Sequence, residues 1–181
     1  MVVIIVEGQT DSEFLQDFIE NQFSIERSIY DFRGLEGKDY IFKLHDNEMY
    51  DTIEDELDAI EKILIVVDAD DPKDKCPIRG YSKTENKLKE LIENLDLNLP
   101  IDYFIFSDAN KEKGYLETFL LSVLDNKQQE CIDKFRNCYE YKLSDKWVFN
   151  TFYKQKKYPF DYSHPNFNEL KEKLINLFKE E

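Results

Sequence analysis

Two stretches decide the fold of this chain: VVIIVEG at residues 2–8 and ILIVVDADD at residues 63–71. Each contains an unbroken run of five apolar, mostly β-branched residues that ends in acid. Such runs are typical of strands buried on both faces of a parallel sheet, whose carboxyl ends form the ligand crevice. Glu7, Asp68 and Asp70 would then meet at one edge. Their charges repel one another unless a cation lies between them, which predicts a divalent metal site.

The remaining pattern alternates between strands and helices. Further strands are expected at Ser28–Phe32 and Ile101–Phe106, with helices at Thr10–Phe23, Asn47–Ile60, Ser82–Leu95 and Tyr115–Leu124. Thr10 and Glu13 have the spacing of a capping box. This order predicts an α/β fold with a mostly parallel four-stranded sheet and helices on both faces.

Beyond residue 125 the strand pattern stops. Three helices are expected there, at Gln128–Tyr139, Ser144–Gln155 and Phe167–Lys179. We therefore predict an α/β domain over residues 1–125 and a helical extension over residues 126–181, packed on the same domain.

Composition limits the possible classes of function. The net charge of −15 over 181 residues opposes nonspecific attraction to a phosphate backbone. No apolar run approaches the roughly 18 residues of a membrane helix, and no positive segment precedes the first strand, so neither a membrane span nor a signal peptide is expected. Three cysteines without a CxxC pair indicate a reduced, cytoplasmic location. P-loop, GxGxxG and GxSxG motifs are absent from the sequence.

The acidic residues suit magnesium, with manganese as a substitute. Mg²⁺ takes oxygen ligands and is typically held by one or two carboxylates. Asp68 and Asp70 are two positions apart and can turn toward one ion, while Glu7 could bind or act as a general acid or base. Turn chemistry is the alternative, because Asp often begins turns and caps helices. It is favoured for Asp71, which precedes Pro72.

Glu117 is a further candidate ligand, at the start of the helix expected after the fourth strand. It could face the crevice from the first turn of that helix. Equally, it could interact with the helix dipole, which is worth about 0.3–1 kcal/mol. Both interpretations stay open.

Basic residues provide candidate phosphate or nucleic-acid contacts. Lys73 and Arg79 lie in the loop after the DxD motif, where they could meet a phosphate or simply offset the acids. Lys146 and Lys154 belong to a segment of lysines and aromatics suited to phosphate contact and base stacking. The helical spacing of Trp147, Val148, Phe152 and Tyr153 instead favours packing into the core or a dimer interface. DNA, RNA, a second copy or a protein partner are the expected partners.

Residues 1–125 resemble a Toprim domain, the fold shared by topoisomerases, primases, the overcoming-lysogenization-defect nucleases and a ribonuclease that matures small ribosomal RNA. The resemblance rests on the Glu7-Gly8-x-x-Asp11 and Asp68-x-Asp70 motifs and their order. Together with Gly114-x-x-Glu117, they are similar to small stand-alone prokaryotic Toprim-like proteins. The chain lacks the glycine that follows DxD in topoisomerases and primases.

The resemblance implies Glu7 as acid/base and Asp68 and Asp70 as ligands of one or two Mg²⁺ ions. Gly8 and Asp11, within the first motif, are then candidate phosphate contacts. The expected function is Mg²⁺-dependent phosphotransfer, specifically nucleic-acid cleavage. One alternative is a non-catalytic regulatory or interaction module. Another is a haloacid-dehalogenase-like phosphatase, with Asp68 as nucleophile and Ser107 in its second motif.

Overall fold

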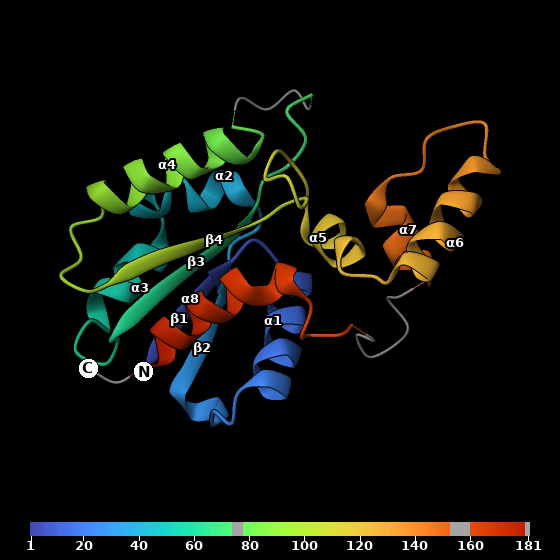
Figure 1. Cartoon of the computed structure of the whole chain (residues 1–181). Coiled ribbons are helices and arrows are strands. Elements are labelled where there is room, and N and C mark those ends of the chain that lie inside the picture. Colours follow the sequence, from blue (N-terminus) through green and yellow to red (C-terminus); the bar gives the residue numbers. More distant parts are fainter. Residues whose placement is uncertain (74–77, 153–159, 180–181) are drawn as a thin grey trace.

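Four parallel strands form the sheet, in the order β2-β1-β3-β4. The computed structural model describes residues 1–73, 78–152 and 160–179. Helices connect the strands and cover both faces of the sheet, which confirms the predicted α/β fold class (Figure 1). The elements are β1 (Val2–Val6), α1 (Gln9–Gln22), η1 (Arg27–Ile29), β2 (Tyr30–Gly34), α2 (Lys38–Ile41), η2 (Leu44–Asp46), α3 (Glu48–Asp55), β3 (Lys62–Asp68), α4 (Tyr81–Asn94), β4 (Ile101–Phe106), α5 (Leu116–Ser122), α6 (Asn126–Asn137), α7 (Asp145–Phe152), η3 (Pro165–Phe167) and α8 (Asn168–Phe178).

The two acid-ended strands lie side by side at the centre of the sheet. Val6, the last residue of β1, pairs with Gly34 of β2 on one side and with Val66 of β3 on the other. All of β1 is buried, as are residues 63–67 of β3. Because both faces of these strands are covered, apolar side chains are favoured at every position, which accounts for the unbroken runs.

Alternate residues of each strand belong to two different cores. Ile4 and Leu64 are buried in the core beneath α1, α5 and α8. Ile5 and Ile65 are buried in the core on the opposite face, with residues of α2, α3 and α4. The sheet therefore divides the molecule into two apolar layers, and its strand ends emerge between them.

Helix α8 completes one of these layers. It packs against β3 and β4, where Leu174 and Leu177 are buried. Lys62 Nζ, at the start of β3, donates to the carbonyl oxygens of Asn176 (3.1 Å) and Lys179 (2.7 Å). The C-terminal helix is thus joined directly to the central strand.

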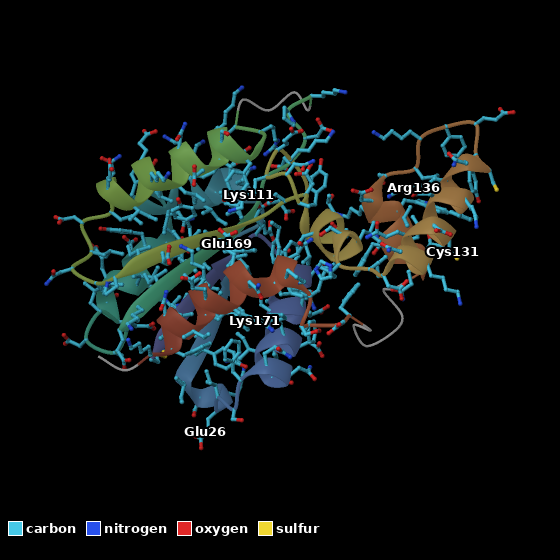
Figure 2. The ribbon with its side chains drawn as sticks, viewed as in Figure 1. Glu26, Lys111, Cys131, Arg136, Glu169 and Lys171 are labelled. Atoms are coloured by element: carbon cyan, nitrogen blue, oxygen red, sulfur yellow. The ribbon has the colours of Figure 1, made fainter. Side chains whose placement is uncertain are left out.

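Helices α6 and α7 form a lobe beside α5, set off from the sheet (Figure 1). Figure 2 shows Cys131 and Arg136 on this lobe, apart from the Lys111–Glu169 ion pair (2.8 Å) that joins the loop after β4 to α8. Val148 of α7 is buried, whereas Trp147 keeps 42% of its surface exposed. Within the described ranges, no helix combines the length and hydropathy needed to cross a bilayer.

Two local predictions were wrong. The helix expected over Asn47–Ile60 ends at Asp55. Its last turn contains acids and no base, and this arrangement is unfavourable at the negative end of a helix. Helix α1 begins one residue earlier than expected, with Gly8 as its N-cap, so the Thr10–Glu13 capping box does not form. Instead, Asp11 Oδ2 accepts the Gly8 N–H (3.1 Å).

Neighbouring residues of α8 allow a matched test of its packing. Leu174 is fully buried, whereas Ile175 is 54% exposed. We expect Leu174→Ala to lower the free energy of unfolding by about 2–5 kcal/mol, because it leaves a cavity against the sheet. Ile175→Ala should stay within about 0.5 kcal/mol of the parent chain. Chemical denaturation followed by circular dichroism measures both; equal effects would contradict the observed packing.

Candidate functional site

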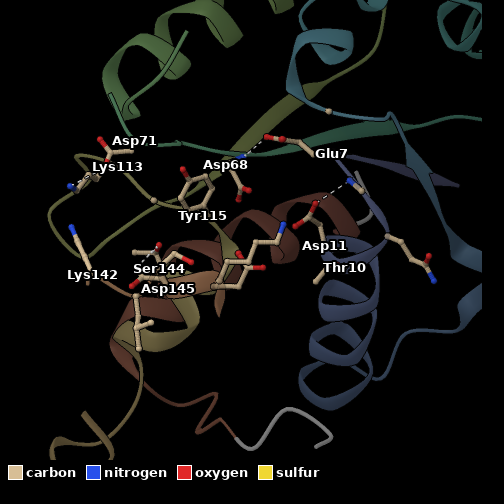
Figure 3. Close-up of a pocket in the computed structure, with 18 residues that line it drawn as sticks. Glu7, Thr10, Asp11, Asp68, Asp71, Lys113, Tyr115, Lys142, Ser144 and Asp145 are labelled. Carbon is tan, nitrogen blue, oxygen red and sulfur yellow. Dashed lines mark hydrogen bonds and ion pairs between the residues drawn. The ribbon is translucent and has the colours of Figure 1, made fainter. Parts of the chain in front are cut away.

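A cavity of about 690 Å³ opens at the carboxyl ends of β1 and β3. Its walls come from the N-terminal turns of α1 and α5 and from residues 142–146, which lead into α7. Six carboxylates line it. Asp71 pairs with Lys113 and Asp145 with Arg136, whereas the other four lie close enough to repel one another: Glu7, Asp11, Asp68 and Glu117. In Figure 3, Glu7, Asp11 and Asp68 gather on one side of the cavity, with Lys142, Ser144 and Asp145 on the other.

Glu7 and Asp68 link the two central strand ends. The backbone N–H of Asp68 donates to Glu7 Oε1 (2.7 Å). The side chain of Asp68 in turn accepts the Leu116 N–H through Oδ1 (2.8 Å), at the first residue of α5. Each bond uses one oxygen of its carboxylate. The two side chains are therefore held in place while keeping a second oxygen for other contacts.

Asp11 and Glu117 enter the cavity from helix N-termini. Asp11 lies in the first turn of α1 and Glu117 in the first turn of α5. Glu117 is buried, with 7% of its surface exposed. The structure thus brings Glu117 to the crevice, as one of its two sequence interpretations requires. Sequence reasoning treated Asp11 as a phosphate contact, whereas here it is part of the acidic group.

Burial and mutual repulsion raise the pKa of three of these carboxylates: Glu7, Asp11 and Asp68. Desolvation and then the neighbouring Glu7 raise the pKa of Asp68 well above its ordinary range. Desolvation raises the pKa of Glu7 to about 7, although the Asp68 N–H and Lys38 oppose it. The pKa of Asp11 rises to about 6, mainly by desolvation, with Glu117 adding repulsion and Lys146 opposing it. At neutral pH the cavity therefore favours bound protons or a bound cation.

The donor set fits a hard divalent cation in its chemistry. Carboxylate oxygens are the preferred ligands of Mg²⁺, and four of the carboxylates on the cavity wall form one mutually repelling group. Among the residues that the structure describes, no three Asp, Glu, His or Cys side chains already surround a common point at metal-binding distance. The carboxylates would therefore have to turn toward a bound ion.

Asp70 has a different environment from the other predicted ligands. Its carboxylate forms ion pairs with Lys38 and with Arg79 (2.6 Å for Arg79), and it is absent from the cavity wall. Its backbone has φ of 61° and forms a two-way bridge with Gly114, with N···O distances of 2.7 and 3.2 Å. In this structure Asp70 organises the loop behind the cavity.

Lys38 is the residue that sequence reasoning missed. Only 3% of its surface is exposed, and its Nζ donates to the Asp68 carbonyl (2.8 Å) and to Thr84 Oγ1 (3.2 Å). A single lysine in a region expected to be a loop gave no signal of burial. Its position beneath Asp68 and Asp70 depends on the short helix α2, which the sequence pattern did not predict.

The glycine of the Gly-x-x-Glu element, Gly114, occupies a position that only glycine fits without strain. Its φ is +133°, and a Cβ there would lie 2.9 Å from Thr118 Cγ2 and 3.0 Å from the Asp108 nitrogen. Glycine therefore allows the loop to bridge to Asp70 and then begin α5 at once. That turn places Glu117 on the cavity wall.

The predicted phosphate contacts are distributed unevenly. Gly8 and Lys146 line the cavity, whereas Arg79 pairs with Asp70 and Lys73 is outside the wall. Lys154 lies outside the described residues. Lys142, which begins the same basic and aromatic segment as Lys146, also lies on the wall. Lys113 is a further lysine there that the sequence did not single out, and it pairs with Asp71 (3.2 Å).

The buried carboxylates predict an unusual pH dependence of stability. Glu7 has a pKa of about 7 in the folded chain against 4.5 unfolded, so the folded state holds the extra proton between these values. The free energy of unfolding should therefore fall as the pH rises from about 4.5 to 7. Glu7→Gln should remove this part of the fall, becoming more stable than the parent at pH 7.5 but not at pH 4.5. Metal-free urea unfolding across this range measures both proteins; identical pH profiles would contradict the burial of Glu7.

Comparisons with known proteins give a family but no activity. No curated protein and no solved structure matches this chain significantly. A family model described as "Protein of unknown function (DUF3226)" matches residues 1–162. The match includes all four strands, the cavity carboxylates and helices α6 and α7. Since it extends over most of the sequence, the chain belongs to the DUF3226 family.

Proposed function

We propose that this protein is a Mg²⁺-dependent nuclease of Toprim type that cleaves phosphodiester bonds. The observation that carries the proposal is the group of four carboxylates, two of them at the carboxyl ends of neighbouring parallel strands, on the wall of one cavity. Buried acids with raised pKa values in a cleft are typical of functional sites. The order of Glu7 and the DxD motif along the chain supports the Toprim assignment.

Asp68 is the central proposed metal ligand. One of its oxygens is fixed by the Leu116 N–H, which leaves Oδ2 to face the ion. Asp11 and Glu117 join it from the adjoining helices. When bound, Mg²⁺ would offset charge on the phosphate and lower the pKa of a coordinated water. Asp70 holds the loop behind the cavity in position. It would bind the metal only after leaving its ion pairs with Lys38 and Arg79.

Glu7 is the proposed general acid/base. Its Oε1 is held by the Asp68 N–H, so Oε2 is the atom that would take the proton from water or return one to the leaving oxygen. The pKa of about 7 suits proton transfer near neutral pH, and a nearby cation would lower it and keep the group ionised.

The opposite wall suits an anionic substrate. Lys142 and Lys146 extend from that wall, with Lys146 close enough to Asp11 to lower its pKa, and Lys113 lies beside Asp71. Gln9 and Thr10, the first residues of α1, also line the cavity, where the helix dipole favours phosphate. A phosphate held between these groups and the carboxylates would lie next to the proposed metal.

The phosphatase alternative receives less support. Ser107, its expected second motif, lines a separate cavity with Phe104 and Asn166 rather than the acidic one. Asp68 also follows the third strand of the chain instead of the first. A non-catalytic module is the remaining alternative. Cleavage and metal-binding measurements distinguish it from a nuclease.

The first test is cleavage. We expect Mg²⁺-dependent cleavage of DNA or RNA, with Glu7→Gln lowering kcat about 10²–10⁴-fold through loss of proton transfer, and Asp68→Ala lowering it at least as much. Fluorescently labelled oligonucleotides resolved on denaturing gels measure this. Asp102→Ala is the matched control, because that acid pairs with Lys173 at the opposite end of the sheet. Undiminished cleavage by both site variants would overturn the assignment.

The second test is metal binding without activity. Mg²⁺ at a hundredfold excess over Kd should stabilise the fold by about 2.7 kcal/mol, a rise in Tm of roughly 5–10 °C. Asp68→Asn should lose most of this rise, whereas Asp102→Ala should keep it. The rise should also be larger at pH 7.5 than at pH 5, where protons compete for the carboxylates. A Tm that does not respond to Mg²⁺ or Mn²⁺ would favour the non-catalytic module.

A further inference from the structure

Exposed aromatic side chains gather on the α6–α7 lobe. Of the six large hydrophobic side chains exposed in the described ranges, three lie within nine residues: Tyr139 (38%), Tyr141 (66%) and Trp147 (42%). They form one connected group, with ring centroids 5.7 Å apart for Tyr139–Tyr141 and 6.1 Å apart for Tyr139–Trp147. The indole ring of Trp147 stacks on Phe135 at 5.8 Å and 9°. The predicted inward packing of Trp147 therefore holds for only one face of its indole ring, the face that lies on Phe135.

A groove beside these rings adjoins the acidic cavity. We call it the aromatic groove; it has a volume of about 350 Å³ and is lined by side chains from residues 136–145, including Tyr139 and Tyr141. Lys142, Leu143 and Asp145 line both the aromatic groove and the acidic cavity. The two hollows therefore lie next to each other, close enough for one chain-like ligand to contact both.

The charge of this lobe differs from that of the rest of the chain. Residues 126–152 contain five basic and four acidic side chains, in a chain whose net charge is −15. Lys142 lies where the two hollows meet. Asp145, the acid shared by both, accepts hydrogen bonds from Arg136 and Thr118, so its charge is compensated. Glu140 is the other acidic residue on the groove wall.

We propose that the aromatic groove binds the unpaired bases of a single-stranded nucleic acid whose backbone enters the acidic cavity. The inference rests on the proposed nuclease function and adds a substrate class to it. Flat, exposed rings interleaved with lysines are how proteins bind single strands without reading sequence. In a duplex the base faces are already stacked on one another, so these rings have nothing to stack on. The lobe thereby selects single strands.

Trp147 provides a direct readout, because it is the only tryptophan in the chain. Titration of unlabelled oligo(dT) or oligo(rU) into the full-length protein, with Ca²⁺ replacing Mg²⁺, should quench its fluorescence as bases stack nearby. A duplex of the same length should leave the fluorescence unchanged. Quenching should weaken with added salt, since Lys142 and Lys146 contact phosphate. Equal quenching by the duplex, or none by any single strand, would overturn the proposal.

Variants of exposed residues separate stacking from folding. Tyr141→Ala should weaken oligonucleotide binding about tenfold, whereas Tyr141→Phe, which keeps the ring, should bind like the parent chain. Ile175→Ala, a change at another exposed apolar residue, on α8, should have no effect. Glu140→Gln should bind more tightly, because it removes a negative charge from the groove wall. Fluorescence anisotropy of a labelled oligonucleotide measures all four variants. Unchanged binding by Tyr141→Ala would contradict the stacking role.

The outcomes distinguish this inference from the proposed function. If single strands bind through Tyr141 but Mg²⁺ yields no cleavage, the aromatic groove stands and the nuclease assignment fails. If cleavage occurs at the same rate on single strands and duplexes and ignores Tyr141→Ala, the groove assignment fails alone. If light scattering shows a dimer that Tyr141→Ala dissociates, these rings form an interface between copies, which also overturns the inference.

Discussion

The hydrogen bond from the Asp68 amide to Glu7 Oε1 ties the last residue of β3 to the residue that follows β1. The same two acids also hold the starts of two helices. The Asp68 carboxylate accepts the first N–H of α5, and the Glu7 carbonyl accepts the N–H of Gly37, just before α2 (3.2 Å). The edge of the sheet is therefore assembled around carboxylates. The residues that hold the crevice together are also the ones that give it charge.

Placing several acids at this edge of the sheet lowers the free energy of unfolding. Taking an acid out of water disfavours its ionised form, and four acids in one cavity repel one another as well. The chain supplies partial compensation through Lys38 beneath Glu7 and Lys146 beside Asp11. The apolar cores on both faces of the sheet stabilise the fold and offset the part of this electrostatic cost that the lysines leave uncompensated. Local violations of ordinary burial rules of this kind are expected at functional sites.

The sequence predicted the features that depend on local pattern. Five-residue apolar runs placed β1 and β3, and chain order brought Glu7 and Asp68 to one edge. Features that depend on distant residues were not predictable in this way. The pairing of Asp70 with Lys38 joins residues far apart in sequence, as does the repulsion of Asp11 by Glu117. Trp147 shows a third case: helical spacing predicted burial, but a two-helix lobe has too few layers to cover both faces of its rings.

The place of α8 in the chain has a consequence for how this fold is reached during synthesis. All four strands precede α8, yet one face of β3 and β4 is covered by it, with Leu174 buried and Lys62 bonded to its last turn. Until α8 has left the ribosome, the apolar side chains that it buries on that face stay uncovered, with α5 packed on part of β4. The nascent chain therefore carries an incomplete core from the end of β4 at Phe106 until α8 has been made. During that interval the uncovered apolar surface makes the chain prone to aggregation, which chaperones limit.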